Sequence, residues 1–541
     1  MPTDIKTLLG ILNKFEILFS EVPESVSTYQ ASLNEINSFV ISCAQDEKFR
    51  DELANSEHVW RSSKACFEKI LLNEKSLSGL SKFEGIHFWY MRSYRAILVL
   101  LRNLSVSNQK IPNDLLLQNM IIKTFITIIS RETVKFDEMT TTCYINTLTL
   151  LHNITKTFII FDKSVLDQTM ALLEYPLHNP NNISEPILFP FILTLINYSQ
   201  NDDFLYYFFK HEKIGLVLNN LLMQNLILNH STLFSKLDIT NIDESKIELS
   251  EVDKIVLKLF KIFACNESFA SYLLELEIYS KDLFFKIFKI LQIVITNTST
   301  WDKFQLTNIM NWCYKIFIKV SNEIKTYFSN NLQSIEVAKC MHDKISISLD
   351  IMSSLVHFEH VQKFLLSYNG LEELISLLEV FQNNLIRINF FKDKDGKLKE
   401  LKSTNSMGAK IDNSKLLYSR IDYKTNTILP TNFPECKSII IEILTQLTYN
   451  KKEIQDKIRE LHGLQLVLSN CVIDDNDPFI KERSIMCIRF LLQENKDNQD
   501  FVAKLEAKKV VKDDVLDEAG YDVAINKDGT IGLVNKSSQQ N

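Results

Sequence analysis

The stretch that decides the fold is Asp475-Asn476-Asp477-Pro478-Phe479-Ile480-Lys481-Glu482-Arg483, which continues through Ile485, Ile488, Leu491 and Leu492 to Asn495 and Gln499. Asp477 is a favourable N-cap, and Pro478 suits the first helical position because its missing N–H needs no partner there. The four aliphatic residues recur at helical spacing, so we expect them to face inward. This pattern predicts the long inner helix of one helical repeat.

The composition favours stacked helices. A chain of 541 residues is too long for one compact core, and it contains only 11 glycines and 10 prolines. No proline occurs between Pro190 and Pro430, which argues against a turn-rich β fold. The formal net charge of −7 gives no general electrostatic reason to expect nucleic-acid binding.

A recurring helix ending supports a repeat architecture. Residues 100–105, 150–155 and 194–199 share the same form, an apolar run that closes on Asn103, Asn153 or Asn197. The first two asparagines are 50 residues apart and the next two are 44 apart, and the distance from Gln446 to Phe490 is again 44. Periods of about 40–47 residues belong to armadillo and HEAT repeats. We therefore predict an all-α armadillo/HEAT-like helical-repeat solenoid.

Glycines open the second helix of several repeats. Asn369-Gly370-Leu371, His462-Gly463-Leu464 and Ile214-Gly215-Leu216 each begin a Leu-rich run. We expect glycine there because the chain turns sharply between two packed helices and needs a permissive backbone.

Two regions depart from the repeat pattern. Residues 391–435 are rich in Lys, Asp, Ser, Thr and Asn, so we expect a flexible polar insertion without enough apolar surface to order it. Near the C-terminus, alternating runs flank Asp528-Gly529, which predicts a small β-hairpin over the open end of the solenoid. The predicted domains are therefore 1–390 (repeats), 391–435 (insertion) and 436–541 (C-terminal domain with hairpin tail).

The C-terminal block resembles a known family. The run from Asp477 to Glu482, the helix through Leu492, the polar end at Asn495 to Gln499 and the later Asp-Gly hairpin are similar to the C-terminal signature domain of the ataxin-10 family. The resemblance covers about Lys437 to Val534 and upstream extends only to general armadillo-like architecture. Length and composition suit the fungal branch, which includes a member named as a copper transport protein.

The resemblance implies a cytoplasmic, non-catalytic armadillo-like protein connected with cytokinesis, cell survival and cell signalling. Family partners include a G-protein beta subunit and mitotic kinases. Whether these partners carry over, and whether the chain forms a homo-oligomer, is left open by the sequence.

Signatures of other functions are missing from the sequence. It contains no Gly-rich phosphate loop, GxSxG, HExxH or paired-Cys zinc pattern, so no enzyme or cofactor is expected. Regular Lys-Arg patches with interleaved aromatics are not evident, which disfavours nucleic acid. The nine cysteines are expected to be reduced and mostly buried. No apolar run of about 18 uncharged residues predicts a membrane span, and the N-terminus is amphipathic, so we expect a cytoplasmic protein.

The name of the fungal family member points to a possible copper site, for which soft ligands would be needed. Cys340-Met341-His342 is the one tight cluster of soft ligands, but consecutive helical residues point about 100° apart and cannot converge on one ion. His357 and His360 could share a helix face, but no third ligand lies nearby in the sequence. We expect no metal site.

Six residues are candidates for partner binding. Asn103, Asn153 and Asn197 could line a groove and bond an extended peptide, as the corresponding asparagine does in armadillo proteins; alternatively, each satisfies a helix terminus. No Trp lies four residues before any of them, which disfavours a nuclear-signal receptor. Lys481, Glu482 and Arg489 could form a recognition surface on the decisive helix, or serve only as salt-linked edges of its packing. Overall we predict a non-catalytic protein-interaction scaffold, with a cargo-binding transport receptor as the main alternative and a copper-homeostasis factor as a remote one.

Overall fold

The computed structural model describes residues 4–73, 84–106, 111–112, 116–130, 137–156, 163–178, 184–223, 226, 249–329, 334–392, 398–505, 521–525 and 531–535. The chain forms two compact units, Met1–Val294 and Ile295–Asn541. The boundaries predicted near residues 390 and 435 stay predictions.

The first unit is built from helices. They are α1 (Ile5–Glu21), α2 (Val26–Gln45), α3 (Glu47–Ala54), α4 (Glu57–Leu72), α6 (Glu84–Leu104), α7 (Leu117–Ile129), α8 (Glu138–Ile154), α9 (Lys163–Glu174), α10 (Glu185–Tyr198), α11 (Asp202–Lys210), α12 (Ile214–Leu216), α15 (Glu251–Ala264), α16 (Glu267–Tyr279) and α17 (Lys281–Thr296). A short 3-10 turn, η3 (Tyr175–His178), and a π-helical segment, η5 (Val217–Met223), complete the list.

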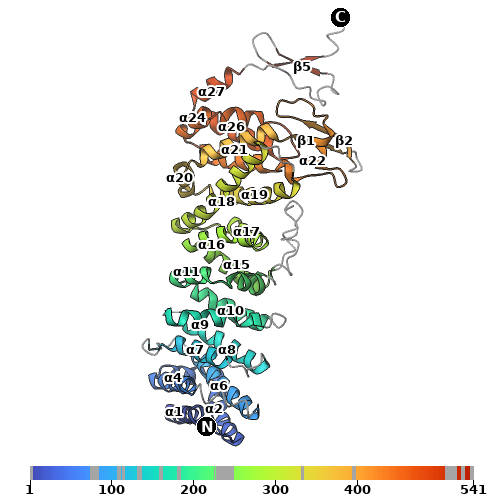
Figure 1. Cartoon of the computed structure of the whole chain (residues 1–541). Coiled ribbons are helices and arrows are strands. Elements are labelled where there is room, and N and C mark those ends of the chain that lie inside the picture. The colour runs from blue at the N-terminus through green and yellow to red at the C-terminus, as the bar shows by residue number, and fades with distance from the viewer. Residues whose placement is uncertain are drawn as a thin grey trace. The chain divides into compact units, whose positions relative to one another are not determined.

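These helices stack in two layers, as a helical-repeat solenoid requires. Helices α2, α6, α8, α10 and α15 pack in succession in the inner layer, and α1, α4, α7 and α9 pack in succession in the outer one. Figure 1 shows the two rows side by side. The recurring endings at residues 100–105, 150–155 and 194–199 therefore fall on successive inner helices, α6, α8 and α10, which confirms the predicted repeat.

Local capping sets where several of these helices begin. The Asp4 side chain accepts a hydrogen bond from Thr7 N at 2.8 Å at the start of α1, and Asp137 does the same for Thr140 N at 2.7 Å in α8. Ser250 and Asp253 form a reciprocal capping box at the start of α15. Such caps satisfy backbone donors that the helix itself leaves unpaired.

The second unit continues the same architecture. Its helices are α18 (Lys303–Ser329), α19 (Ile335–Leu355), α20 (Glu359–Ser367), α21 (Gly370–Asn384), α22 (Ser414–Arg420), α23 (Cys436–Thr448), α24 (Lys452–Glu460), α25 (Gly463–Ser469), α26 (Ile480–Leu492) and α27 (Lys496–Ala503). Helices α18, α19, α23 and α26 pack in succession, while α20, α21, α24 and α25 pack around them.

The glycines that open α21 and α25 are needed for a different reason from the one predicted. Neither has a positive φ; the left-handed residues are their predecessors, Asn369 (φ 59°) and His462 (φ 61°). A Cβ on Gly370 would lie 2.8 Å from the carbonyl oxygen of Leu365, so the preceding helix approaches too closely for any side chain. Close packing, and not backbone freedom, excludes larger residues there.

Residues 391–435 are not the coreless polar loop that their composition suggests. Strand β1 (Arg387–Lys392) pairs antiparallel with β2 (Leu398–Thr404), and α22 is followed by the short pair β3 (Ile421–Asp422) and β4 (Thr427–Ile428) and by the turn η8 (Pro430–Asn432). Ile386, Ile388 and Ile421 form a small core against which partly buried apolar residues pack: Phe390, Leu401, Ile411, Leu416, Leu417 and Ile428. The sequence pattern hid this core because its residues come from several short elements.

The C-terminal hairpin is confirmed. Strand β5 (Tyr521–Ile525) pairs antiparallel with β6 (Ile531–Asn535), with Val523 opposite Leu533. The Asp528-Gly529 turn between the two strands lies outside the described residues.

The cysteines behave as buried small side chains. All nine are free thiols, and Cys43, Cys66, Cys143, Cys313, Cys436 and Cys487 are buried. Burial raises the pKa of the Cys66 thiol to about 12, which suppresses the reactive thiolate. Among the described residues, no helix is both long and apolar enough to cross a membrane.

Candidate functional site

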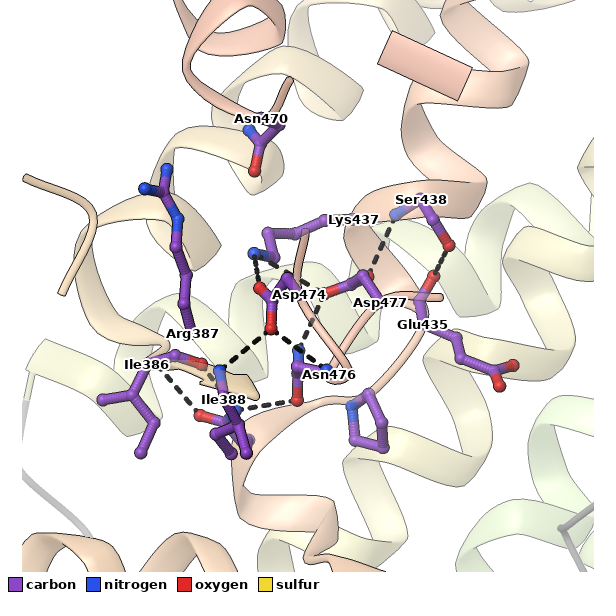
Figure 2. A network of polar contacts seen from close by, with 12 residues as sticks. Ile386, Arg387, Ile388, Glu435, Lys437, Ser438, Asn470, Asp474, Asn476 and Asp477 are labelled. Carbon is purple, nitrogen blue, oxygen red and sulfur yellow. Dashed lines mark hydrogen bonds and ion pairs between the residues drawn. The ribbon is translucent and has the colours of Figure 1, made fainter. Parts of the chain in front are cut away.

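A buried polar network lies at the centre of the C-terminal block (Figure 2). The Nζ of Lys437 lies 3.2 Å from Asp474 Oδ2 and 3.5 Å from Asp477 Oδ2. Asn432 and Asn476 complete this buried polar network. Each of its five residues has an exposed fraction of 3% or less. Buried charges persist only where partners satisfy them, so the geometry of this cluster is tightly specified.

Asp477 caps a different helix from the one predicted. Its Oδ1 accepts a hydrogen bond at 3.1 Å from the backbone N–H of Ser438, in the first turn of α23. Helix α26 begins only at Ile480, after Phe479 in the left-handed region (φ 64°). The prediction that Asp477 and Pro478 cap α26 is therefore wrong, because the Asp477 carboxylate instead caps the neighbouring inner helix α23.

Asp474 and its neighbours hold the first strand of the inserted segment. Asp474 Oδ1 accepts from Ile388 N at 3.0 Å and from Asn476 N at 3.0 Å, and Ile388 O accepts from Asp475 N at 2.7 Å. The loop before α26 is thus hydrogen-bonded to both backbone groups of Ile388 in β1.

Asn432 fixes the other side of the same loop. Its Oδ1 accepts from Ile386 N at 3.1 Å, while its Nδ2 donates to Ile386 O at 2.9 Å and to Asn476 Oδ1 at 2.7 Å. One amide therefore links the residue that precedes β1, the turn η8 and the loop before α26, and a buried amide used this fully is structural.

Two cations lie near the carboxylates of the buried polar network: Lys437 contacts Asp474 and Asp477, and the partly buried Arg387 also interacts electrostatically with Asp474. Burial raises the pKa of Asp477 above its ordinary value of 3.8, opposed by the nearby Lys437 and reinforced by Asp474. Burial and the nearby Asp474 carboxylate therefore favour the protonated form of Asp477, against the opposing effect of the Lys437 ammonium. The network is a stability element, because its polar groups bond one another and the backbone of β1 and α23.

The opposite face of α26 is exposed. Lys481, Glu482 and Arg489 are all exposed there, together with Ile485 (52%) and Met486 (44%). We call these five residues the α26 outer face. Within the described part of the chain, none of the three charged side chains forms an ion pair, and their role as a recognition surface or as packing edges stays a prediction.

The inward face of α26 also differs from the one predicted. Ile480, Ser484, Cys487 and Leu491 are the buried residues, whereas Ile485 is half-exposed and Ile488 is only partly buried. Two small residues, Ser484 and Cys487, face the core because α23 packs closely against this side, which a count of aliphatic positions could not reveal. Sequence reasoning missed Met486 and Ile485 as surface residues for the same reason.

The three asparagines tie each inner helix to the one before it. Asn103 Nδ2 donates to Val40 O at 3.2 Å, Asn153 Nδ2 to Ser105 Oγ at 3.0 Å, and Asn197 Nδ2 to His152 O at 2.8 Å. In each case the acceptor belongs to the end region of the preceding inner helix. Their use in binding a peptide stays a prediction.

The soft-ligand cluster does not converge. Met341 is buried at 4% exposure, while His342 Nε2 lies 3.1 Å from Pro434 O and Cys340 is only partly buried. His360 instead contacts Thr307 Oγ1 at 2.8 Å. Among the described residues, no group of three or more His, Cys, Asp or Glu side chains is arranged to hold a metal ion.

Comparison with known proteins gives one family. A family model described as the spinocerebellar ataxia type 10 protein domain matches residues 436–534, which include the α26 outer face and every residue of the buried polar network except Asn432. A protein of Candida glabrata named Ataxin-10 homolog is 43% identical over 534 residues, covering 98% of this chain and 99% of that protein. One of Saccharomyces cerevisiae with the same name is 36% identical, covering 95% of this chain and 93% of that protein.

Two further matches either cover a shorter stretch of the chain or have low structural similarity. Human Ataxin-10 is 39% identical over 87 residues, which is 16% of this chain and 18% of that protein. The solved structure of the SYS-1/POP-1 complex covers 96% of this chain and 97% of that chain at 10% identity, with a TM-score of 0.28. So low a score does not establish a shared arrangement, and the fold described above rests on the helices themselves.

Proposed function

The chain belongs to the ataxin-10 family, and from that premise we propose that it is a non-catalytic scaffold that binds partner proteins through the α26 outer face. Cytoplasmic action in cytokinesis or cell signalling, with a G-protein beta subunit or a mitotic kinase as partner, is the setting that the family suggests. Homo-oligomerisation stays open within this proposal.

One observation carries the proposal. Two large apolar side chains, Ile485 and Met486, are exposed at 52% and 44% on the same face of α26 as three charges without ion pairs in the described structure. An apolar centre with a charged rim is the usual composition of a protein-binding surface. The helix beneath cannot shift easily, because its buried side packs on α23 and α25, and α27 also contacts it.

A cargo-binding transport receptor is less well supported. Such a receptor would donate hydrogen bonds from asparagine Nδ2 groups along its groove, whereas the Nδ2 groups of Asn103, Asn153 and Asn197 each already donate to an acceptor at the preceding inner helix. For a role in copper homeostasis, no group of three or more His, Cys, Asp or Glu side chains among the described residues supplies a metal site.

Affinity capture with surface variants tests the proposal. A truncation after Leu444 would be a poor test, because it would remove Asp474 and Asp477 and leave Lys437 without these two partners. Point substitutions avoid this structural damage. We propose Ile485→Glu with Met486→Glu, which should abolish capture of specific partners while leaving the helical circular dichroism unchanged.

A matched variant controls for the added charge. Ile335 and Val337 in the first turn of α19 are each 47% exposed, so Ile335→Glu with Val337→Glu introduces the same charge on equally exposed apolar positions. Capture by this control should equal that of the wild type. Equal losses in both variants, or none in either, would remove the α26 outer face from the proposal.

A further inference from the structure

Three arginines lie along one face of the inner helix α6. Phe88, Arg92, Arg95, Val99 and Arg102 follow one another at intervals of four and three residues, so their side chains share one side of the helix. The opposite side is the core: Tyr94, Ile97 and Leu101 are all fully buried. We call Arg92, Arg95 and Arg102 the arginine stripe.

No carboxylate among the described residues neutralises the arginine stripe. Arg102 Nη1 donates to Asn146 Oδ1 at 2.8 Å and Nη2 to Asn103 Oδ1 at 3.2 Å, and both acceptors are neutral amides. Arg92 contacts the ring of Trp89, with 5.2 Å from its Cζ to the ring centroid. The Nε of Arg95 is buried and has no hydrogen-bond partner.

The carboxylates on the helices next to α6 form no ion pair with the arginine stripe among the described residues. Helix α2 carries only Glu35, which bonds Lys14 Nζ at 2.7 Å, and α8 carries only Glu138, in its first turn. On α3, Glu47 pairs with Arg50 at 3.5 Å. Partial burial lowers the pKa of Arg102, and the like charge of Arg95 lowers it further. An uncompensated guanidinium that is partly desolvated gains most from an incoming anion.

The surroundings of the arginine stripe suit an extended backbone. Val99 on α6 and Ile145 and Thr149 on α8 are partly exposed, and Phe88 is exposed at 45%. The half-buried Asn153 accepts no hydrogen bond at Oδ1 from any described residue, so this oxygen can receive a peptide N–H. Hydrophobic contacts and neutral hydrogen-bonding groups around fixed cations are what a peptide needs.

We propose that the face of α6 bearing the arginine stripe binds an extended acidic segment of a partner protein. From Arg92 to Arg102 the helix rises about 15 Å. Alternate side chains of an extended peptide are about 6.6 Å apart, so carboxylates at positions i, i+2 and i+4 span a similar length. The bidentate guanidinium geometry matches carboxylates directly.

A peptide suits this face better than a nucleic acid. The chain as a whole has a formal net charge of −7, which repels a long polyanion, whereas a short acidic segment meets only the local field. The inference deepens the scaffold function proposed above but uses a different helix in the first unit, so failure of one does not imply failure of the other.

Fluorescence anisotropy on the full-length chain tests the inference. The probe is a fluorescein-labelled nonapeptide in which glutamate alternates with threonine, and its counterpart carries glutamine in place of every glutamate. We expect the glutamate peptide to bind at least roughly tenfold more tightly than the glutamine peptide, and less tightly as salt is raised. Equal affinity for the two peptides would overturn the inference.

Three variants locate the binding. Arg92→Glu changes an exposed side chain, Arg102→Lys keeps the charge but loses the planar fork, and Arg95→Met removes a buried nitrogen that has no partner. Each should weaken the glutamate peptide by about fivefold or more, and Arg95→Met should do so without lowering the melting temperature. Unchanged peptide affinity in all three would contradict the proposal.

Two controls test whether a general change in net charge or binding of a nucleic acid explains the result. Arg61→Glu on α4 makes the same change in net charge as Arg92→Glu at an arginine that already pairs with Glu57, and it should bind the peptide like the wild type. A fluorescent ten-nucleotide oligo(dT) is the competing polyanion. Tighter binding of this oligonucleotide than of the peptide, lost in the same variants, would replace the acidic segment with nucleic acid and overturn the inference.

Discussion

The carboxylate of Asp477 accepts a hydrogen bond at 3.1 Å from the backbone N–H of Ser438, 39 residues earlier in the chain. A residue from the loop before α26 thereby caps the neighbouring inner helix α23. Because Lys437 lies beside that cap and contacts both Asp474 and Asp477, the start of α23, the loop and β1 form one unit. The α26 outer face is held in place by this arrangement.

Lys437→Met is expected to destabilise the second unit strongly. The substitution preserves most of the side-chain volume but removes the ammonium that contacts two buried carboxylates, at a cost of about 3–5 kcal/mol. Urea unfolding followed by circular dichroism measures the loss. Adding Asp477→Asn to this variant should recover part of the stability, whereas exposed Lys452→Met should change it by less than about 0.5 kcal/mol. No recovery in the double variant would argue against charge imbalance as the cause.

The raised pKa of Asp477 predicts a pH dependence. Because folding favours its protonated form, its contribution to stability is complete below the ordinary pKa of 3.8 and is lost as the pH rises through the folded-state pKa. Asp477→Asn cannot ionise, so its stability relative to the wild type should improve as the pH rises across that window. Amide exchange in α23 between pH 4 and 7 measures both proteins; a difference independent of pH would contradict the assignment.

Alanine at three similar glycines should have opposite effects. A Cβ at Gly370 or Gly463 would lie 2.8 Å from an atom of the preceding helix, Leu365 O or Ile458 Cγ2, whereas at Gly215 the nearest atom is Leu283 Cδ2 at 3.5 Å. Gly370→Ala and Gly463→Ala should each cost about 1–3 kcal/mol. Gly215→Ala should be neutral or gain up to about 1 kcal/mol through helix propensity. Thermal unfolding of the three variants provides the comparison, and equal effects would contradict close helix approach.

Much of the fold was accessible from the sequence. Periodic apolar residues and recurring endings predicted the inner helices α6, α8 and α10, and the Asp528-Gly529 turn predicted the pairing of β5 with β6. These signals are local, so they survive without knowledge of the three-dimensional neighbours.

The missing parts depend on contacts between distant residues. Asp477 has the chemistry of an N-cap, but only the fold decides that it caps α23 and not α26. The core around Ile388 and Ile421 joins elements more than thirty residues apart, so composition suggested a flexible loop. The inward face of α26 uses Ser484 and Cys487, which no hydrophobicity pattern selects.

The inserted segment should therefore behave as a folded element. Ile388→Ala removes a fully buried side chain and should cost about 2–5 kcal/mol, with faster amide exchange in β1 and β2. Met407→Ala at an 89% exposed side chain is the control and should leave exchange unchanged. If β1 and β2 exchange freely in the wild type, the segment is flexible after all.

Site-specific photocrosslinking tests the central claim most directly. The photoreactive amino acid p-benzoylphenylalanine would replace Met486 on the α26 outer face or, as a control, Val337 on α19, residues exposed at 44% and 47%. The account predicts discrete protein adducts from position 486 that are absent from position 337 and correspond to partners lost by Ile485→Glu with Met486→Glu. Identical adducts from both positions, or none from position 486, would contradict protein binding at this face.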